Sequence, residues 1–321
     1  MNTGTAILET FYQAAGQFVS GDQLASALKR PAGAIAGEIN ELRQLGYKIE
    51  SHPHFGYRLL ESPDRLTGDD IRAQLKSEII GPEILVFDET ASTNDITQHL
   101  ARNGAREGLV VFAESQTRGR GRHGRVWASP RGKGLWFSVL LRPAFPPRAA
   151  QRITVAAAVA VARAVRRVTG EDARIKWPND VTMRDQKIAG ILTELHAEAD
   201  EILFAILGVG IDVNCTREEL PDIATSLQIE TGKPHDRTAL AAAVLSELDD
   251  CYQAALTEFE RVSDEWAGLC TTLGRQIVVT MGSRRIEGHA QALDGDGALL
   301  LRRDNGQIER ILAGDVTVER A

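Results

Sequence analysis

The spacing of apolar residues changes twice along this chain, and these changes constrain the fold more than any other feature of the sequence. Residues 1–62 place apolar side chains at helical spacing in short stretches. Residues 83–214 instead combine short β-branched runs with one long Ala-rich segment, Ala149–Thr169. After Gly274 only short apolar runs and tight turns remain. No single pattern fits all three regions, so the sequence predicts three structural units.

The predicted fold is α+β. Residues 1–62 predict three short helices and a β-hairpin, which are typical of a winged helix-turn-helix, and residues 63–82 predict a linker with a short helix. Residues 83–270 predict a mixed α/β domain, and residues 271–321 predict a small closed β-barrel. In the first unit we expect helices around Ile7–Phe11, Leu24–Leu28 (with Ser20 as N-cap) and Ile35–Leu45, and strands at Tyr47–Glu50 and Gly56–Leu60.

The rest of the chain predicts two long helices and eleven strands. The helices are Ala149–Thr169 and Thr238–Phe259. The middle domain is expected to have strands at Glu83–Phe87, Leu109–Phe112, Leu135–Leu141, Arg174–Trp177, Ile188–Leu195 and Ile202–Ile211. The last domain is expected to have them at Gln276–Thr280, Arg285–Ala292, Ala298–Leu301, Ile308–Ile311 and Val316–Glu319.

Composition and charge exclude several classes of protein. The 321 residues include 37 Lys and Arg against 44 Asp and Glu, so overall charge does not favour nucleic acid. Cys215, Cys251 and Cys270 lie far apart without metal-ligand spacing, which predicts reduced thiols and no metal site held by the protein. Because the chain has no signal-peptide pattern and no apolar run long enough for a bilayer, we expect a cytoplasmic protein without a membrane partner.

Residues 117–133, the Arg/Gly loop, contain six cations and no acidic residue. Glycine lets a backbone approach a ligand closely, and arginine offers forked donors that match phosphate or carboxylate. The loop therefore predicts a site for a polyanion, with a solvated charged loop as the alternative. Gly119, Gly121 and Gly124 also fit G-x-G-x-x-G, but Pro130 follows too soon for the helix that a dinucleotide site needs.

A second cluster, Lys176–Asp180, follows a predicted strand, and Lys187 opens the next strand. This spacing predicts that the two lysines, Asn179 and Asp180 lie close together at the mouth of a hairpin. Trp177 beside Pro178 would form a rigid apolar wall there. An ordinary surface turn is the alternative interpretation.

Five motifs, in this order and spacing, resemble those of biotin–protein ligases. They are Ser92-Thr93-Asn94, Gln116 with Gly119–Pro130, Lys176–Asp180, Lys187–Leu192 and Gly208–Ile211. Nearly the whole chain is similar to the family of bifunctional biotin ligases and biotin operon repressors. The resemblance implies a winged helix-turn-helix, a central catalytic domain like that of class II synthetases, and a C-terminal SH3-like barrel.

The resemblance also implies a two-step reaction. Biotin and ATP, with Mg²⁺, would form biotinyl-5′-AMP, and the activated acyl group would pass to one lysine of a biotin carboxyl carrier protein. Adenylation gives a poorly electrophilic carboxylate a good leaving group, and cations offset the repulsion between the two anions. A DNA operator and a ligand-coupled homodimer are the further partners that the resemblance implies.

Matching positions imply roles for individual residues. Biotin contacts would be Ser92, Thr93, Asn94, Gln116, Arg120, Gly121, Arg122 and Lys187, although Ser92 also fits a helix N-cap. Nucleotide contacts would be Arg118, Arg125, Trp127, Lys176, Asn179, Asp180 and Asp212. The catalytic residues would be Lys187 at the biotin carboxylate, Arg122, and Asp180, which would orient or deprotonate the acceptor lysine. DNA contacts would be Lys29, Arg30, Arg43 and Arg58.

Two positions depart from the family pattern. Asp212 stands where the family usually has Asn, and a carboxylate there would repel a nucleotide phosphate unless Mg²⁺ or an arginine compensates. The predicted recognition helix begins at Pro31–Glu38 with Ala and Gly, whereas reading base edges needs side chains such as Arg, Asn or Gln. Residues 1–62 also carry only five cations against six anions.

Two other functions stay open at this point. A ligase of the same superfamily could act on lipoate or octanoate, although the Lys176–Asp180 motif and the terminal barrel argue against it. A biotin-sensing transcription factor without catalysis is the second alternative, for which Asp212 leaves room. Pyrophosphate release with biotin, lipoate or octanoate distinguishes these functions.

Overall fold

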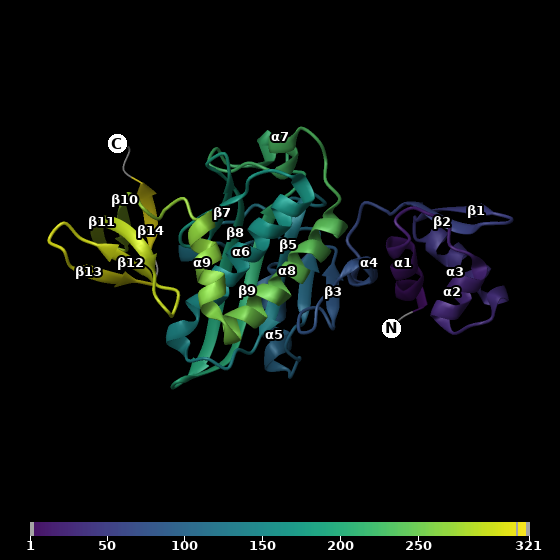
Figure 1. The fold of residues 1–321 in the computed structure, drawn as a ribbon, viewed down its shortest axis with the longest axis horizontal. Coiled ribbons are helices and arrows are strands. Elements are labelled where there is room, and N and C mark those ends of the chain that lie inside the picture. The colour runs from purple at the N-terminus through teal and green to yellow at the C-terminus, as the bar shows by residue number, and fades with distance from the viewer. Residues whose placement is uncertain (1–2, 313, 319–321) are drawn as a thin grey trace.

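A computed structural model describes residues 3–312 and 314–318 and shows three units in a row (Figure 1). A helical N-terminal unit lies at one end and a C-terminal β-sheet at the other, with the mixed α/β domain between them. None of the helices in the described part of the chain is long and apolar enough to cross a membrane.

The N-terminal unit has the predicted order of three helices and a hairpin. Its elements are α1 (Thr3–Gln13), α2 (Gly21–Leu28), α3 (Ala32–Gln44), β1 (Lys48–His52) and β2 (Gly56–Glu61). Ser20 caps α2 as expected: its hydroxyl accepts from the Gln23 N–H at 3.1 Å, and the Gln23 side chain accepts from the Ser20 N–H at 2.9 Å. Ile7, Leu24 and Ile39 are fully buried in a core that belongs to this unit.

The short helix α4 (Gly68–Gln74) joins the N-terminal unit to the central domain. Its buried Asp70 accepts hydrogen bonds from the Tyr12 hydroxyl at 2.9 Å, the Thr67 hydroxyl at 2.7 Å, and the Tyr47 hydroxyl. Burial and the Asp70 carboxylate raise the pKa of both tyrosines, so they remain protonated donors. Ile71, next to Asp70, belongs to the central core, so one helix turn is packed into both units.

The central domain is built on a seven-stranded sheet with the order β3-β4-β5-β9-β8-β7-β6. The strands β3 and β4 pair in parallel, and the other neighbours pair antiparallel. The predicted strands are confirmed, and β7 is an additional strand that the apolar pattern did not separate. The bounds are β3 (Ile84–Phe87), β4 (Val110–Ala113), β5 (Gly134–Leu141), β6 (Arg174–Lys176), β7 (Asp180–Met183), β8 (Gln186–Glu198) and β9 (Glu201–Asp212).

Helices cover both faces of this sheet. Three of them, α6 (Gln151–Thr169), α8 (Arg237–Thr257) and α9 (Phe259–Leu269), lie on one face, and α5 (Thr93–Arg102) packs against the other (Figure 1). The second predicted long helix corresponds to α8 and ends at Thr257. The sequence analysis did not predict α9, which follows it. The short α7 (Leu227–Thr231) follows the end of β9.

The C-terminal unit is an antiparallel sheet with the order β13-β12-β11-β10-β14. All five predicted strands are present, although Glu319, the last residue expected in them, lies outside the described residues. Ile277 and Leu299 on the inner face of this sheet belong to the same apolar cluster as the central domain. The bounds are β10 (Gln276–Met281), β11 (Arg284–Leu293), β12 (Leu299–Arg302), β13 (Ile308–Ile311) and β14 (Asp315–Val318).

Substitutions at two glycines can measure how closely the linker packs against the central domain. Gly108 and Gly104 both have a positive φ, +84° and +86°. A Cβ on Gly108 would lie 1.8 Å from the Ile79 carbonyl oxygen, whereas a Cβ on Gly104 would meet nothing within 4 Å. We expect Gly104→Ala to cost about 1 kcal/mol, the usual cost of a left-handed non-glycine residue, and Gly108→Ala to cost at least about 3 kcal/mol because the linker must move. Urea unfolding measures both values, and equal losses would contradict the close contact.

Candidate active site

A cavity of about 390 Å³ lies between the N-terminus of α5, the Arg/Gly loop and strands β7, β8 and β9. This volume is in the range of small-molecule sites, about 300–1,000 Å³. All eight residues predicted to contact biotin line it, and so do the residues predicted to contact the nucleotide, except Arg118. The structure therefore brings four distant motifs and Gly208–Gly210 of the fifth to one place.

One end of the cavity is a hydrogen-bond network around the start of α5. The side-chain amide oxygen of Gln116 accepts from the Thr93 backbone N–H at 2.8 Å, and the buried Ser138 hydroxyl donates to the Asn94 amide oxygen at 2.5 Å. The Asn94 amide nitrogen donates to Glu194 at 2.7 Å. Ser92 is the N-cap residue of α5, but its hydroxyl makes no capping hydrogen bond. These contacts fix which polar atoms face the cavity.

The floor of the cavity is a strip of backbone without side chains. Gly190 on β8 pairs with Gly210 on β9, and Trp127 of the Arg/Gly loop lies against both. A Cβ on Gly190 would lie 2.7 Å from the indole, and one on Gly210 would lie 2.5 Å from it. The Trp127 indole N–H is buried without a hydrogen-bond partner, and the Lys187 ammonium lies 5.0 Å from the ring centroid.

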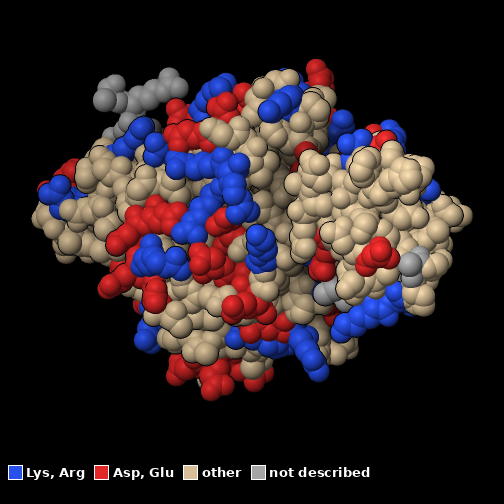
Figure 2. Space-filling model, turned by 45° about the vertical axis from the view of Figure 1, so that its right-hand side comes forward, with Lys and Arg blue, Asp and Glu red and all other residues tan. Residues whose placement is uncertain are grey.

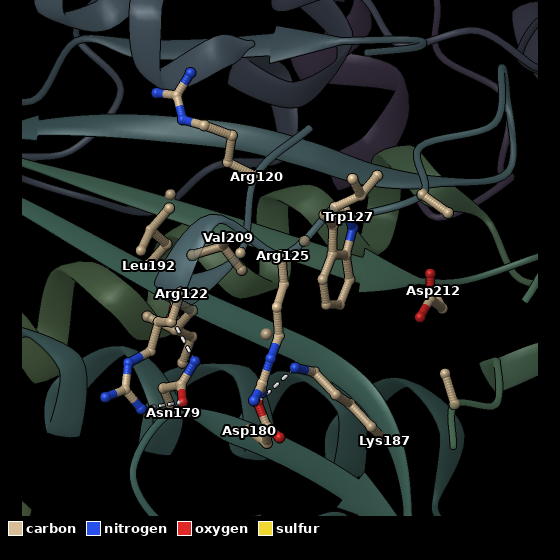
Figure 3. Close-up of a pocket in the computed structure, with 18 of the residues that line it drawn as sticks. Arg120, Arg122, Arg125, Trp127, Asn179, Asp180, Lys187, Leu192, Val209 and Asp212 are labelled. Carbon is tan, nitrogen blue, oxygen red and sulfur yellow. Dashed lines mark hydrogen bonds and ion pairs between the residues drawn. The ribbon is translucent and has the colours of Figure 1, made fainter. Parts of the chain in front are cut away.

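Charged groups gather beside this floor, as Figure 3 shows. Lys187 Nζ lies 2.6 Å from Asp180 Oδ1. Arg122 donates to the Asn179 amide oxygen at 3.1 Å and to the Gly314 carbonyl at 3.2 Å, and burial lowers the pKa of its guanidinium. The sequence prediction that Lys176, Asn179, Asp180 and Lys187 lie close together is confirmed: Lys176 pairs with Asp180 across β6 and β7, and all four line the cavity.

The C-terminal unit completes the rim. Arg125 pairs with Asp315 on β14, and both Asp315 and Val316 line the cavity. Val126 and Ile223 stand at the same rim and are 86% and 76% exposed, so the mouth has an apolar edge that a ligand or partner can cover.

Two of the predicted arginines lie apart from this charged group. Arg120 is turned away from the charged group (Figure 3), because its guanidinium makes two hydrogen bonds to Asp95, at 2.7 and 2.9 Å, and a longer one of 3.5 Å to Glu194. The Arg120 guanidinium lowers the pKa of Asp95. Arg118 does not line the cavity.

Asp212 lines the cavity at the end of β9 and is only 2% exposed. Burial raises the pKa of its carboxyl to about 8. The Cys215 thiol, 3.8 Å from Asp212 Oδ1, is buried beside it.

Sequence reasoning missed several residues of the site. Ser138 is a single polar residue inside the buried apolar run of β5, and that contrast was a usable signal. Glu194 looks like an outward polar residue of an alternating strand, and Asp315 lies in another domain, so neither carried a sequence signal.

The four cations predicted to contact DNA lie in the N-terminal unit, and three of them make contacts within it. Arg30 pairs with Glu38 at 3.4 Å, and Arg58 pairs with Glu50 at 2.5 Å. Arg43 donates to the Ile49 carbonyl at 2.7 Å and so ties α3 to the hairpin.

Models of known protein families match three parts of this chain. The Biotin/lipoate A/B protein ligase family matches residues 86–212, the Biotin protein ligase C terminal domain matches residues 272–318, and an HTH domain matches residues 5–58. The bifunctional ligase/repressor BirA of Bacillus subtilis (strain 168) is 36% identical over 315 residues, which cover 97% of each chain. The chain belongs to the biotin protein ligase family.

Two further comparisons agree with this family membership. The bifunctional ligase/repressor BirA of Escherichia coli (strain K12) is 33% identical over 315 residues, covering 95% of this chain and 94% of that one. A solved structure of biotin protein ligase from Aquifex aeolicus, in complex with biotin and ATP, is similar with a TM-score of 0.63 and 29% identity. The similarity extends over 75% of this family member and over the whole of the Aquifex aeolicus chain.

The glycine floor generates a test of the cavity geometry. Gly210→Ala should push the Trp127 indole off β9, so that more of the tryptophan fluorescence becomes accessible to acrylamide quenching. Gly268→Ala is the matched control, since a Cβ there meets nothing within 4 Å. Unchanged quenching in Gly210→Ala would show that the indole does not rest on this backbone.

Proposed function

We propose that this chain attaches biotin, through biotinyl-5′-AMP, to a lysine of a biotin carboxyl carrier protein. The observation that carries the proposal is the position of Lys187, which lies between Asp180 and Trp127 in a cavity lined by all five motifs. The relatives named biotin ligases support the same activity for this chain.

In the first step, we infer that a biotin carboxylate oxygen bonds to the α-phosphorus of ATP, and pyrophosphate leaves. The network of Gln116, Thr93 and Asn94 offers donors and acceptors suited to the ureido ring. Lys187 and Arg122 would neutralise charge where carboxylate and phosphate meet. Mg²⁺ would arrive with ATP, because phosphate oxygens are its preferred ligands.

In the second step, the acceptor lysine would lose a proton to Asp180 and attack the carbonyl carbon of the adenylate. The bond from that carbon to the phosphate oxygen then breaks, AMP leaves, and an amide forms. Asp180 is suited to this role because its half-buried carboxylate is already held beside the cavity by Lys187.

We propose that residues 1–62 form a winged helix-turn-helix and residues 63–82 a linker. Residues 83–270 would form a class II synthetase-like domain, and residues 271–321 an SH3-like barrel. We also propose a cytoplasmic location, where ATP is supplied and where the free thiols of Cys215, Cys251 and Cys270 remain reduced. Ligand-coupled dimerisation stays an expectation from the family.

We further propose that the N-terminal unit binds a DNA operator and so represses transcription. The HTH match and the relatives named ligase/repressor support this role. Figure 2 shows that the unit, which comes forward in this view, presents a largely uncharged face with charges at its edges. Because this unit has few unpaired cations, we expect its non-specific affinity for DNA to be weak. Binding to the operator would then depend on contacts made by a small number of residues.

Biotin-dependent exchange of pyrophosphate into ATP tests the ligase proposal. The intact protein should catalyse exchange with biotin and not with lipoate or octanoate, and Lys187→Ala should lose at least about a hundredfold in rate because charge stabilisation at the carboxylate is lost. The exposed Lys233→Ala is the matched control and should keep the full rate. Absence of exchange with biotin would favour a sensor without catalysis, and exchange with lipoate would favour the related ligase.

A gel shift with a biotin-gene promoter, with and without biotinyl-AMP, tests the repressor proposal. Among the described residues, Lys29 at the end of α2 forms no side-chain ion pair or hydrogen bond, whereas Arg30 and Arg58 pair with glutamates and Arg43 donates to the Ile49 carbonyl. Lys29→Ala should weaken binding and reduce the slope of log affinity against log salt by about one. No shift at low salt would indicate a ligase whose N-terminal unit does not bind this DNA.

A further inference from the structure

Asp212 has an unusual position for a carboxyl group. It is the last residue of β9, pairs with Gly134 of β5, lines the cavity and is 2% exposed. A carboxylate removed from water is costly unless a cation or several donors compensate for the lost hydration.

The groups that face Asp212 do not supply that compensation. Lys187 on β8 is the nearby cation, but its ammonium is paired with Asp180 at 2.6 Å. From the segment after β9, the Cys215 thiol approaches Asp212 at 3.8 Å, a weak contact, and it also approaches the Lys133 carbonyl at 3.8 Å. Within the described residues, no lysine or arginine forms an ion pair with Asp212.

These contacts decide which form of the carboxyl group is stable. Burial raises the pKa of Asp212, and the Cys215 contact and the charge of Lys187 lower it only in part, so that it reaches about 8. Burial, with the Asp212 charge second, raises the pKa of the Cys215 thiol as well. Both groups are therefore protonated near neutral pH, and the cavity has no negative charge at this point.

We propose that Asp212 serves nucleotide binding as a neutral carboxylic acid, which presents one O–H donor and one carbonyl acceptor to the cavity. This inference rests on the proposed ligase function and concerns nucleotide binding at the same site. Like an asparagine amide, a protonated carboxyl group carries no charge and offers both a donor and an acceptor, so the residue at this position need not repel a triphosphate. Loss of the proton creates a buried anion beside Lys187, which weakens binding of the nucleotide but not of neutral groups at the far end of the cavity.

The first test measures KM for MgATP and for biotin in the exchange reaction from pH 6.5 to 9.5. In the intact protein, KM for MgATP should rise by up to about tenfold per pH unit once Asp212 ionises. Asp212→Asn should keep a low KM throughout, whereas Asp200→Asn, an exposed residue in the turn between β8 and β9, should behave like the intact protein. If Asp212→Asn shows the same pH dependence as the intact protein, the inference is wrong.

Two readouts do not depend on catalysis. The infrared band of a protonated carboxylic acid should be present in the intact protein at pH 7 and absent in Asp212→Asn. Since the folded state binds one proton more than the unfolded state between pH 4 and 8, the thermal midpoint should fall relative to that of Asp212→Asn as the pH rises through this window. No such band, or parallel midpoints, would overturn the inference, whereas lack of biotin-dependent exchange at every pH would overturn the ligase proposal alone.

Discussion

The pairing register of β8 and β9 determines whether this domain has a cavity. Gly190 faces Gly210 across the two strands, so bare backbone lies beneath the Trp127 indole. At the next pair, Leu192 faces Gly208, and the Leu192 side chain lines the cavity. Because side chains alternate between the faces of a sheet, a one-residue slip of β8 would place the side chain of Ala189 or Ile191 where Gly190 now lies beneath the indole. The Trp127 indole and the Asn94 amide both use the room that the glycines leave.

Electrostatics explain how an acidic protein keeps so many cations at one place. Lys187, Arg122 and Arg125 each have a partner in the structure: a carboxylate of β7, the Asn179 amide with a backbone carbonyl, and a carboxylate of β14. These partners come from two domains, so the loop is held from both sides. An anionic ligand of matching shape competes with these groups for the cations and does not meet bare charge.

Motifs with unusual chemistry were readable from the sequence, and most helices and strands followed from their apolar spacing. Lys187 and Asp180 could be paired in advance because a short hairpin brings them together. The direction of Arg120 could not, since its guanidinium is bound by the carboxylate of Asp95, the residue that follows Asn94 on α5. Asp315 was equally hidden, because its position depends on how the C-terminal sheet packs on the central domain. Long-range packing, and not local propensity, decided these two residues.

The buried Asp70 on α4 has a consequence for how the protein moves. A stretch of twenty residues between two domains can act as a flexible tether, and the N-terminal unit would then sample many orientations. Here Tyr12 and Tyr47 grip a carboxylate whose helix is inserted in the central core. The linker is therefore a rigid connection. Rotation of the N-terminal unit requires the two tyrosine hydroxyls to break their hydrogen bonds to a carboxylate that has almost no access to water. The fold therefore fixes the distance between the N-terminal unit and the central domain.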